Sequence, residues 1–231
     1  MHTLIMPLVG PMQSWGYRSR FDDRDTGLEP TRSGVIGLIC AAMGIPRADD
    51  ISRFDSLRMG IRVDAPGRAM VDYHTAMDVI KADGSGKDTV VSYRHYLSDA
   101  RFLAGLESVE FALVEEIDAA LRHPVWPLFL GRKSFVPALP VHLAGSSVQR
   151  DTTLEKALKA FPYFRLRERE DIPTSLRLVI EPKPGEETYM AQSDWPLSYG
   201  DRRFGLRNVK TDWVEAENLQ DGGVWPCISP G

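Results

Sequence analysis

The sequence predicts an α+β fold in which short strands and helices alternate along a chain of 231 residues. Three observations point to this class. Apolar runs of strand length recur, segments with helical spacing lie between them, and two long segments flank a glycine-containing turn in the pattern of a β-hairpin. A chain of this length fits one large domain or two small ones, and we expect a single domain over residues 1–231.

The first part of the chain supplies a strand, a loop, a helix and a second strand. Residues 3–9 read as a buried strand, and residues 10–30 as a long loop of the kind that is functional or disordered in compact domains. A helix is expected from about residue 31 to residue 43, ended by Gly44 and Pro46. Residues 57–64 alternate apolar and polar side chains, which predicts a half-buried strand.

Residues 70–97 predict a hairpin that protrudes from the body. The sequence at its centre fits a two-residue turn at Gly84-Ser85. The arms are long and polar for a core hairpin, so we interpret them as an extended β-arm. This register sets three cross-strand pairs: Lys81 with Asp88, Tyr73 with Tyr96, and His74 with His95.

The second part of the chain continues the alternation. We expect a strand over residues 101–106, a helix over 107–122, an irregular segment over 125–140, a short helix over 153–160, and strands over 175–181 and 204–213. The glycine- and proline-rich residues 222–231 predict a flexible tail. This order of elements fits an α+β sandwich of the ferredoxin-like type.

Composition and charge limit the functional classes. The net charge of −4 argues against a generic nucleic-acid binder, which carries a basic excess. Of the 28 basic residues, however, 21 are arginine, the residue suited to phosphate and base contacts, although a GC-rich genome explains the same bias. The two cysteines form no CxxC pair, which excludes a thiolate zinc site and fits a reducing compartment. No apolar stretch has the length of a membrane span and no leader is recognisable, so we expect a cytoplasmic protein.

The sequence contains no motif for metal, nucleotide or acyl-transfer chemistry. Neither a histidine pair bracketing a carboxylate, nor a P-loop, nor a GxSxG turn occurs, so we expect no metal and no cofactor. His74 and His95, with tyrosines nearby, could form an acid–base pair for metal-free RNA cleavage. Two histidines that face each other across a hairpin are also ordinary strand composition.

A loop near the N-terminus is a candidate for RNA contact. It offers amide, hydroxyl and indole groups that can read a base edge or stack on a base. Alternatively, its tryptophan anchors the loop in the core. The residues concerned are Met12, Gln13, Ser14 and Trp15.

Two further segments are candidates for phosphate contact. The start of the first helix combines free N–H groups with a full charge, unless it is a simple N-cap beside a solvated arginine. Its residues are Thr31, Arg32, Ser33 and Gly34. Arg132 and Lys133 form a cationic pair that either binds phosphate in the same way or lies in a solvated turn.

Four ordered blocks of the sequence together resemble the CasD family, the Cascade subunits of CRISPR subtype I-E within the RAMP superfamily. The resemblance covers about residues 1–145 and continues more weakly into the strand near residues 203–214. The blocks are GPMQSWG at 10–16, PTRSGVIGLICAAMGI at 30–45, YRHYLSDARFLAGLE at 93–107 and WPLFLGRKSFVPALP at 126–140.

The resemblance implies a fold and a role. Family members have a ferredoxin-like, RRM-related RAMP body with a β-hairpin thumb, here residues 70–97, and they hold the 5′ handle of the CRISPR RNA (crRNA) at one end of the complex. The thumb reaches toward the neighbouring backbone subunit, and the body abuts the large subunit that reads the PAM. A non-catalytic RNA-binding subunit in antiviral defence is therefore implied. The thumb residues expected at the RNA are Tyr73, His74, Arg94 and His95.

Two other functions stay open. Related proteins of a sister subtype cleave precursor RNA without metal, so a metal-independent endoribonuclease of CRISPR repeats is the alternative. The sequence has no clear catalytic triad at the positions of that subtype, which argues against it. An unrelated α+β enzyme is the third hypothesis.

Overall fold

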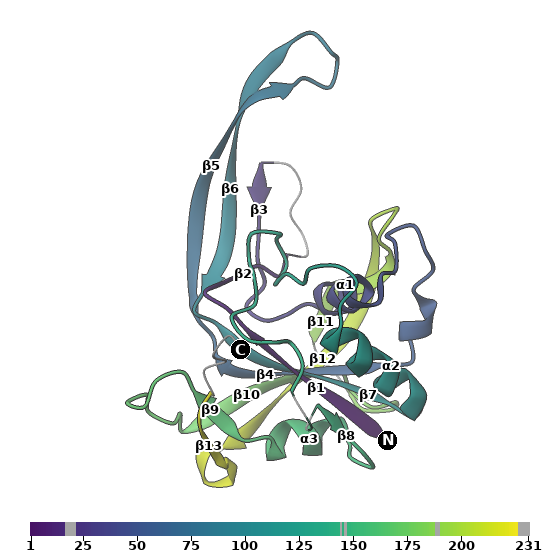
Figure 1. The fold of residues 1–231 in the computed structure, drawn as a ribbon, viewed down its shortest axis with the longest axis vertical. Helices are drawn as coiled ribbons and strands as arrows, with labels where there is room; N and C mark the ends of the chain where they lie inside the picture. The colour runs from purple at the N-terminus through teal and green to yellow at the C-terminus, as the bar shows by residue number, and fades with distance from the viewer. Residues whose placement is uncertain (17–21, 144, 146, 188–189, 226–231) are drawn as a thin grey trace.

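A seven-stranded antiparallel sheet forms the centre of the structure (Figure 1). The computed structural model describes residues 1–231 apart from 17–21, 144, 146, 188–189 and 226–231. Helices lie against the sheet, so the architecture confirms the predicted α+β class. The strands, in their order across the sheet, are β11 (Met190–Ser198), β12 (Arg203–Glu215), β10 (Ser175–Ile180), β4 (Arg58–Ala65), β7 (Arg101–Ser108), β1 (His2–Val9) and β8 (Val148–Gln149).

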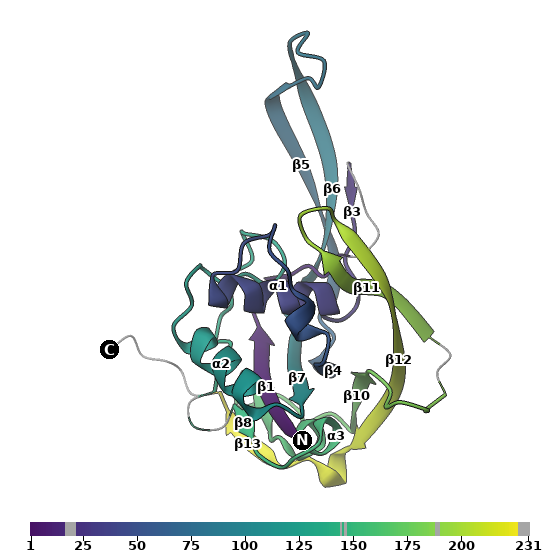
Figure 2. The same cartoon turned by 90° about the vertical axis from the view of Figure 1, so that its right-hand side faces the viewer.

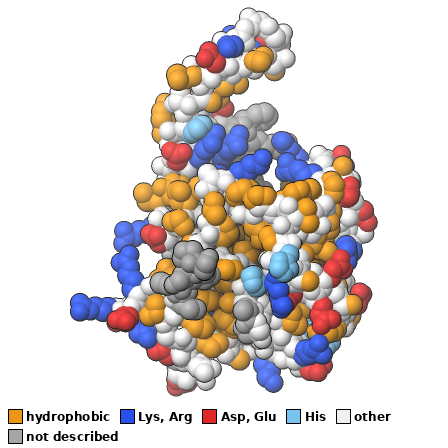
Figure 3. All heavy atoms as spheres, viewed as in Figure 1, with side chains coloured by type: hydrophobic (Ala, Val, Ile, Leu, Met, Phe, Trp, Pro, Cys, Tyr) orange, Lys and Arg blue, Asp and Glu red, His pale blue; other side chains and the backbone are white. Residues whose placement is uncertain are grey.

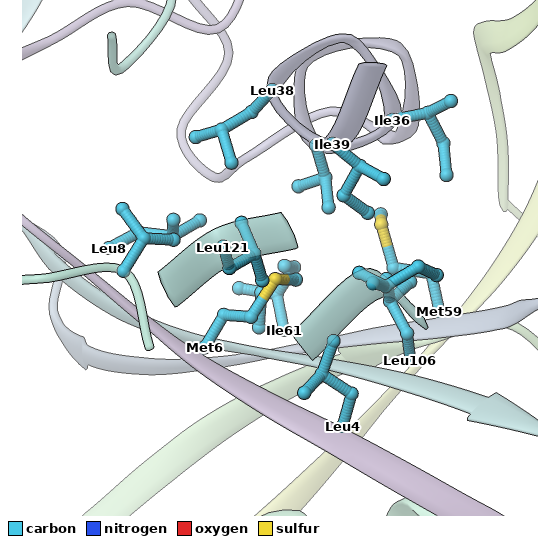
Figure 4. Packing of buried hydrophobic residues seen from close by; sticks show 14 of the residues in the cluster. Leu4, Met6, Leu8, Ile36, Leu38, Ile39, Met59, Ile61, Leu106 and Leu121 are labelled. Carbon is cyan, nitrogen blue, oxygen red and sulfur yellow. The ribbon is translucent and has the colours of Figure 1, made fainter. Parts of the chain in front are cut away.

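Helices cover both faces of this sheet. On one face, α1 (Arg32–Met43) and α2 (Phe111–Arg122) enclose a core with alternate residues of β1, β4 and β7, as Figure 4 shows. On the other face, α3 (Leu154–Ala160) packs on Ile5 and Leu103. Because side chains alternate across a strand, the central strands bury residues on both sides. Two short 3₁₀ turns, η1 (Ser52–Phe54) and η2 (Ala216–Asn218), complete the helical segments of the described chain.

The second face of β4 is buried, which corrects the prediction of a half-buried strand. Arg62 points to the face expected to be exposed, yet it is 0% exposed. Its guanidinium donates to the carbonyl of Leu158 at 2.8 Å and to that of Phe161, and it pairs with Asp64 at 2.7 Å. The carbonyls at the end of α3 lack partners within the helix, and Arg62 satisfies them. The polar residue Arg62 in this alternating strand therefore caps a helix and does not contact solvent.

The helix α1 has the predicted ends. Thr31 is the N-cap, and its hydroxyl accepts a hydrogen bond from the Gly34 N–H at 3.2 Å. Gly44 ends the helix in the left-handed conformation, at φ 70°. The helix α2 begins at Phe111 rather than at residue 107, because β7 continues through Ser108.

A long hairpin projects from the body (Figures 1 and 2). It consists of β5 (Arg68–Ile80) and β6 (Lys87–Ser98), and the inner part of β6 also pairs with the two-residue strands β2 (Met12–Gln13) and β3 (Asp23–Arg24). The predicted register is wrong. Tyr73 pairs with Tyr93 rather than Tyr96, and His74 pairs with Ser92 rather than His95.

Two irregularities explain the different register. The connection spans residues 81–86 rather than two residues, and it is closed by a hydrogen bond from the Lys81 N–H to the Gly86 carbonyl at 2.9 Å. The pairing also shifts between Ala76 and Val79, where Asp78 has a φ of 59°. Lys81 is no longer directly opposite Asp88, although the two charged groups lie 4.0 Å apart.

The C-terminal segment is ordered further than predicted. Residues 222–224 belong to β13 (Asp221–Val224), which pairs in parallel with β9 (Tyr163–Arg165). Trp225 stacks on Phe164 with ring centroids 4.3 Å apart, so the expected tail does not begin at residue 222. Residues 226–231 lie outside the described residues. In the described part of the chain, no helix is long and apolar enough to cross a membrane.

Candidate nucleic-acid interface

Three arginines meet where the hairpin joins the body. Arg24 of β3 lies directly opposite Arg94 of β6 in the parallel pairing of these strands. Arg132, in the irregular segment after α2, donates to the carbonyl of Arg24 at 3.1 Å and to that of His95 at 2.9 Å. We call this set the arginine cluster. Figure 3 shows Lys and Arg side chains gathered at the base of the hairpin.

The side chains of the arginine cluster repel one another. The pKa of Arg132 lies below its usual range, first because the group is desolvated and then because Arg94 and Arg24 repel its charge. Asp72 and Asp25 oppose this shift without cancelling it. Like charges placed directly opposite each other on paired strands cost stability. An anion such as a phosphate would remove that repulsion, and arginine forks match its geometry.

Aromatic and basic groups extend the cluster along the hairpin. Tyr73 and Tyr93 form an edge-to-face pair with ring centroids 5.5 Å apart, and they are 61% and 51% exposed. His95 Nε2 lies 3.1 Å from an Asp23 carboxylate oxygen, and Lys133 is exposed beside Arg132. Because side chains alternate across a strand, the two rings lie on the face of the hairpin opposite Arg94 and Arg24. Exposed rings of this kind can stack on the bases of a single-stranded nucleic acid.

Gln13 and Trp15 are buried, so the predicted base reading by these residues is not available on the surface. Trp15 is 1% exposed, and its indole N–H donates to Gln13 Oε1 at 3.1 Å. The Gln13 amide donates to the carbonyls of Leu8 and Ala100. The alternative prediction, a tryptophan that anchors the loop in the core, describes the structure.

Ser14 and Met12 belong to the same anchored loop. The Ser14 hydroxyl, which is almost fully buried, donates to the His95 carbonyl at 3.3 Å and thus ties the loop to β6. Met12, in β2, pairs with Ser98 of β6, and its partly buried side chain packs against the core. The loop therefore holds the base of the hairpin and lies under the arginine cluster.

The start of α1 is closed to anions, which corrects the prediction for Arg32. The Arg32 N–H donates to an Asp194 carboxylate oxygen at 2.8 Å. Its guanidinium is 1% exposed and contacts both carboxylate oxygens of Glu181, at 2.9 and 3.0 Å. Arg207 completes this buried cluster through Asp194. The protein supplies the anions itself, from residues 149 and 162 positions further along the chain.

The remaining residues at this helix start are also engaged. Thr31 is 5% exposed and acts as the N-cap. The Ser33 carbonyl accepts a hydrogen bond from the Tyr199 hydroxyl, and a Cβ at Gly34 would lie 2.7 Å from the Trp15 ring. Gly34 thus provides room for the buried tryptophan rather than an approach for phosphate.

The sequence analysis did not assign Arg24 or Tyr93 to the RNA contacts, and it considered Tyr93 only as a neighbour of the possible His74–His95 pair. Arg24 stands between Asp22, Asp23 and Asp25, so the run reads as acidic. Its place opposite Arg94 depends on a strand of two residues, which is too short for a periodic signal. Tyr93 would have been found with the correct hairpin register, because it is the cross-strand partner of Tyr73.

The predicted acid–base pair on the hairpin is not formed. His74 lies opposite Ser92, and His95 lies opposite Val71, so the two imidazoles are three positions apart along the ribbon. Among the described residues, no group of three His, Cys, Asp or Glu side chains is placed to hold a metal ion.

Known proteins with similar sequences and folds point to one family. The family model described as CRISPR-associated protein (Cas_Cas5) matches residues 3–214. The CRISPR system Cascade subunit CasD of Escherichia coli (strain K12) is 34% identical over 157 residues, which cover 61% of this chain and 69% of CasD.

Two solved structures share the fold. One, described as "Crystal structure of Cas protein", has a TM-score of 0.77 at 40% identity and covers 95% of this chain and 98% of its own. The other, a chain of a "CRISPR RNA-guided surveillance complex", has a TM-score of 0.76 at 33% identity and covers 95% of this chain and 94% of its own. The chain therefore belongs to the Cas5 (CasD) family of CRISPR-associated proteins.

Proposed function

We propose that the protein is a non-catalytic RNA-binding subunit of a type I-E Cascade surveillance complex and holds the 5′ handle of the crRNA in antiviral defence. The observation that carries this proposal is the arginine cluster of Arg24, Arg94 and Arg132, whose mutual repulsion an RNA phosphate would relieve. The similarity to CasD and to a chain of an RNA-guided complex supports the assignment to such an assembly.

The strand order supports a ferredoxin-like, RAMP-type body. The chain runs strand, helix, strand, strand, helix, strand through β1, α1, β4, β7, α2 and β8, and these strands lie in the order β4-β7-β1-β8. The hairpin β5–β6 is then the thumb, directed at the neighbouring backbone subunit. The body faces the large PAM-reading subunit, and the complex works in the cytoplasm.

The RNA contacts are divided by chemistry. The arginine cluster and Lys133 contact backbone phosphates, and the exposed faces of Tyr73 and Tyr93 stack on bases that the hairpin separates. His74 and His95 lie on the same ribbon and contribute hydrogen bonds. Arg32, Gln13 and Trp15 are excluded from the contact set, because their polar groups are buried and bonded within the protein.

A paired charge removal tests the arginine cluster. We expect the double variant Arg24→Ala/Arg94→Ala to bind handle RNA at least about tenfold more weakly than the wild type in fluorescence anisotropy, with a salt dependence lower by about one to two counterions. The control is Arg167→Ala/Arg169→Ala, which removes the same charge from an exposed segment of mixed sign. Equal losses of affinity and equal salt slopes in the two double variants would refute the assignment.

Incubation of the wild-type protein with repeat RNA in EDTA tests the endoribonuclease alternative. Metal-free cleavage needs an acid and a base within hydrogen-bond reach of the reacting oxygens, and the register separates His74 from His95. We expect intact RNA. Specific cleavage that is lost in the double variant His74→Ala/His95→Ala would establish a nuclease instead.

A further inference from the structure

In the part of the chain that the structure describes, no strand lies beside the outer edge of β5. Within the described residues, β6 has neighbours on both sides, with β5 on one side and β2 and β3 on the other. The strand β5, in contrast, pairs only with β6 over its thirteen residues. Figure 1 shows β5 on the side of the hairpin that faces away from β3.

The hydrogen bonds of β6 identify which residues of β5 face outward. The Tyr93 N–H donates to the Asp22 carbonyl at 2.8 Å, so the backbone of Tyr93 points away from β5. The His95 carbonyl accepts from Arg132 and Ser14 and points the same way. Their partners Tyr73 and Val71 therefore form non-hydrogen-bonded pairs with β6, and their own N–H and C=O groups face outward.

The same alternation extends along the regular part of β5. The outward groups belong to Ala69, Val71, Tyr73 and Thr75, whereas the residues between them bond to β6. This row ends at the irregularity after Ala76.

The β5 edge lacks most of the features that protect natural edge strands. The sequence of β5 contains no proline and no lysine, and its only irregularity lies near the tip. Six of its apolar side chains are exposed by more than a third: Met70, Val71, Tyr73, Met77, Val79 and Ile80. A long, apolar edge of this kind pairs readily with another chain, so we expect it to be covered when the protein works.

The chemistry of the edge favours a polypeptide over RNA as the occupant. Outward N–H and C=O groups alternate along the edge, and a second strand satisfies both, whereas phosphate oxygens accept hydrogen bonds but donate none. The acidic side chain of Asp78 also repels phosphate, whereas Asp72 lies opposite Arg94 and offsets the charge of the arginine cluster. The arginine cluster lies on the other side of β6, with β3. RNA and a protein strand can thus occupy opposite sides of the hairpin.

We propose that an extended segment of a neighbouring protein subunit adds to the outer edge of β5 between Arg68 and Ala76 as an additional strand. The bound segment carries apolar residues against the exposed side chains of the edge. The inference rests on the proposed role as a subunit of an assembly. It does not involve the arginine cluster, and Tyr73 takes part in both proposals, through its ring in the RNA contacts and through its backbone at the edge.

Amide hydrogen exchange tests this proposal without any substitution. In the free protein, we expect the amides of Val71, Tyr73 and Thr75 to exchange fast, and those of Asp72 and His74 to exchange slowly. In the complex purified with partner Cascade subunits, all of them should exchange slowly. Fast exchange of the outward amides in the complex would overturn the proposal, as would equal protection by guide RNA alone or by self-association of the free protein.

A proline at an outward position provides the matched genetic test. Val71→Pro removes an outward N–H and leaves the β6 ladder intact, whereas Val71→Ala trims the side chain and keeps the N–H. We expect Val71→Pro to enter the complex at least about tenfold less than Val71→Ala in competition, with unchanged handle-RNA affinity. Equal incorporation would refute strand addition, and a parallel loss of RNA binding would show that the hairpin itself is damaged. Failure of the arginine variants to alter RNA binding would count against the proposed function alone.

Discussion

Replacing Arg32 with methionine removes a charge that the protein buries among its own acceptors. The guanidinium donates to Glu181 and to the carbonyls of Leu57 and Phe54, each at about 2.9 Å. It also stacks 3.8 Å above the ring of Trp195. Methionine preserves most of the apolar stem, so the substitution tests the charge and its hydrogen bonds rather than the volume.

The expected loss of stability follows from what remains after the substitution. Breaking one partner of a buried ion pair costs about 3–5 kcal/mol, because the other charge is left uncompensated. Glu181 keeps the Met59 N–H at 2.8 Å and Arg207 at 3.5 Å, which places the loss toward the lower end of that range. The carbonyls of Leu57 and Phe54 lose their hydrogen-bond donor, which increases the expected loss of stability. We therefore expect a loss of about 4 kcal/mol.

Urea unfolding followed by tryptophan fluorescence measures this loss. With an m-value of about 3 kcal/mol/M, the midpoint falls by more than about 1 M. The control is Arg53→Met, because Arg53 pairs with Glu116 on the surface, where both side chains are almost half exposed. That change should cost less than about 1 kcal/mol. A loss below 1 kcal/mol for Arg32→Met, or weaker RNA binding by its folded fraction, would refute the buried role.

Two further predictions concern pH and the turn under the arginine cluster. Burial raises the pKa of Glu155, but hydrogen bonds from Arg58 outweigh it and hold the pKa at about 2, below the ordinary value of 4.5. This contribution to stability is complete above pH 4.5 and is lost as the pH falls toward 2, so Glu155→Gln should cost at most about 1 kcal/mol at pH 7 and nothing near pH 2 in urea unfolding. A difference that stays constant with pH would contradict this. Gly131 has a φ of 97°, and a Cβ there would lie 1.7 Å from the Ser14 carbonyl oxygen. Gly131→Ala should therefore lower both thermal stability and RNA affinity. Gly84→Ala, with a φ of 71° and open space, should cost about 1 kcal/mol and leave RNA affinity unchanged. Equal effects of the two alanines would show that the contact with Ser14 is unimportant.

Local signals in the sequence predicted the elements that local physics determines. The helix α1 follows from Thr31 at one end and Gly44 at the other, since a cap and a left-handed terminator act within a few residues. The hairpin strands followed from two long segments around a glycine-rich turn. Its register did not, because the connection spans residues 81–86 rather than two residues and Asp78 adopts a positive φ that its sequence context does not signal.

Long-range partners explain why Arg32 was assigned to the wrong environment. A basic residue at a helix start is ordinarily solvated, or it binds an anion. Here Asp194 and Glu181 occupy the N–H group and the guanidinium, and nothing near residue 32 announces them. Arg24 is the opposite case. Its acidic neighbours in the sequence gave no sign of a basic site, yet in the structure it lies beside Arg94 and Arg132.

The anchored loop and the arginine cluster have separate roles in the proposed RNA site. Ser14 bonds to the Leu130 carbonyl through its N–H and to the His95 carbonyl through its hydroxyl, so the segments that carry Arg132 and Arg94 are fixed before any ligand arrives. Arginines held in place lose little conformational entropy on binding. A substitution at Gly131 consequently alters RNA affinity by displacing Arg132, whereas Arg24→Ala alters RNA affinity by removing a charge. Only the second kind of change lowers the salt dependence directly, and for this reason the salt slope, rather than affinity alone, identifies the residues that contact phosphate.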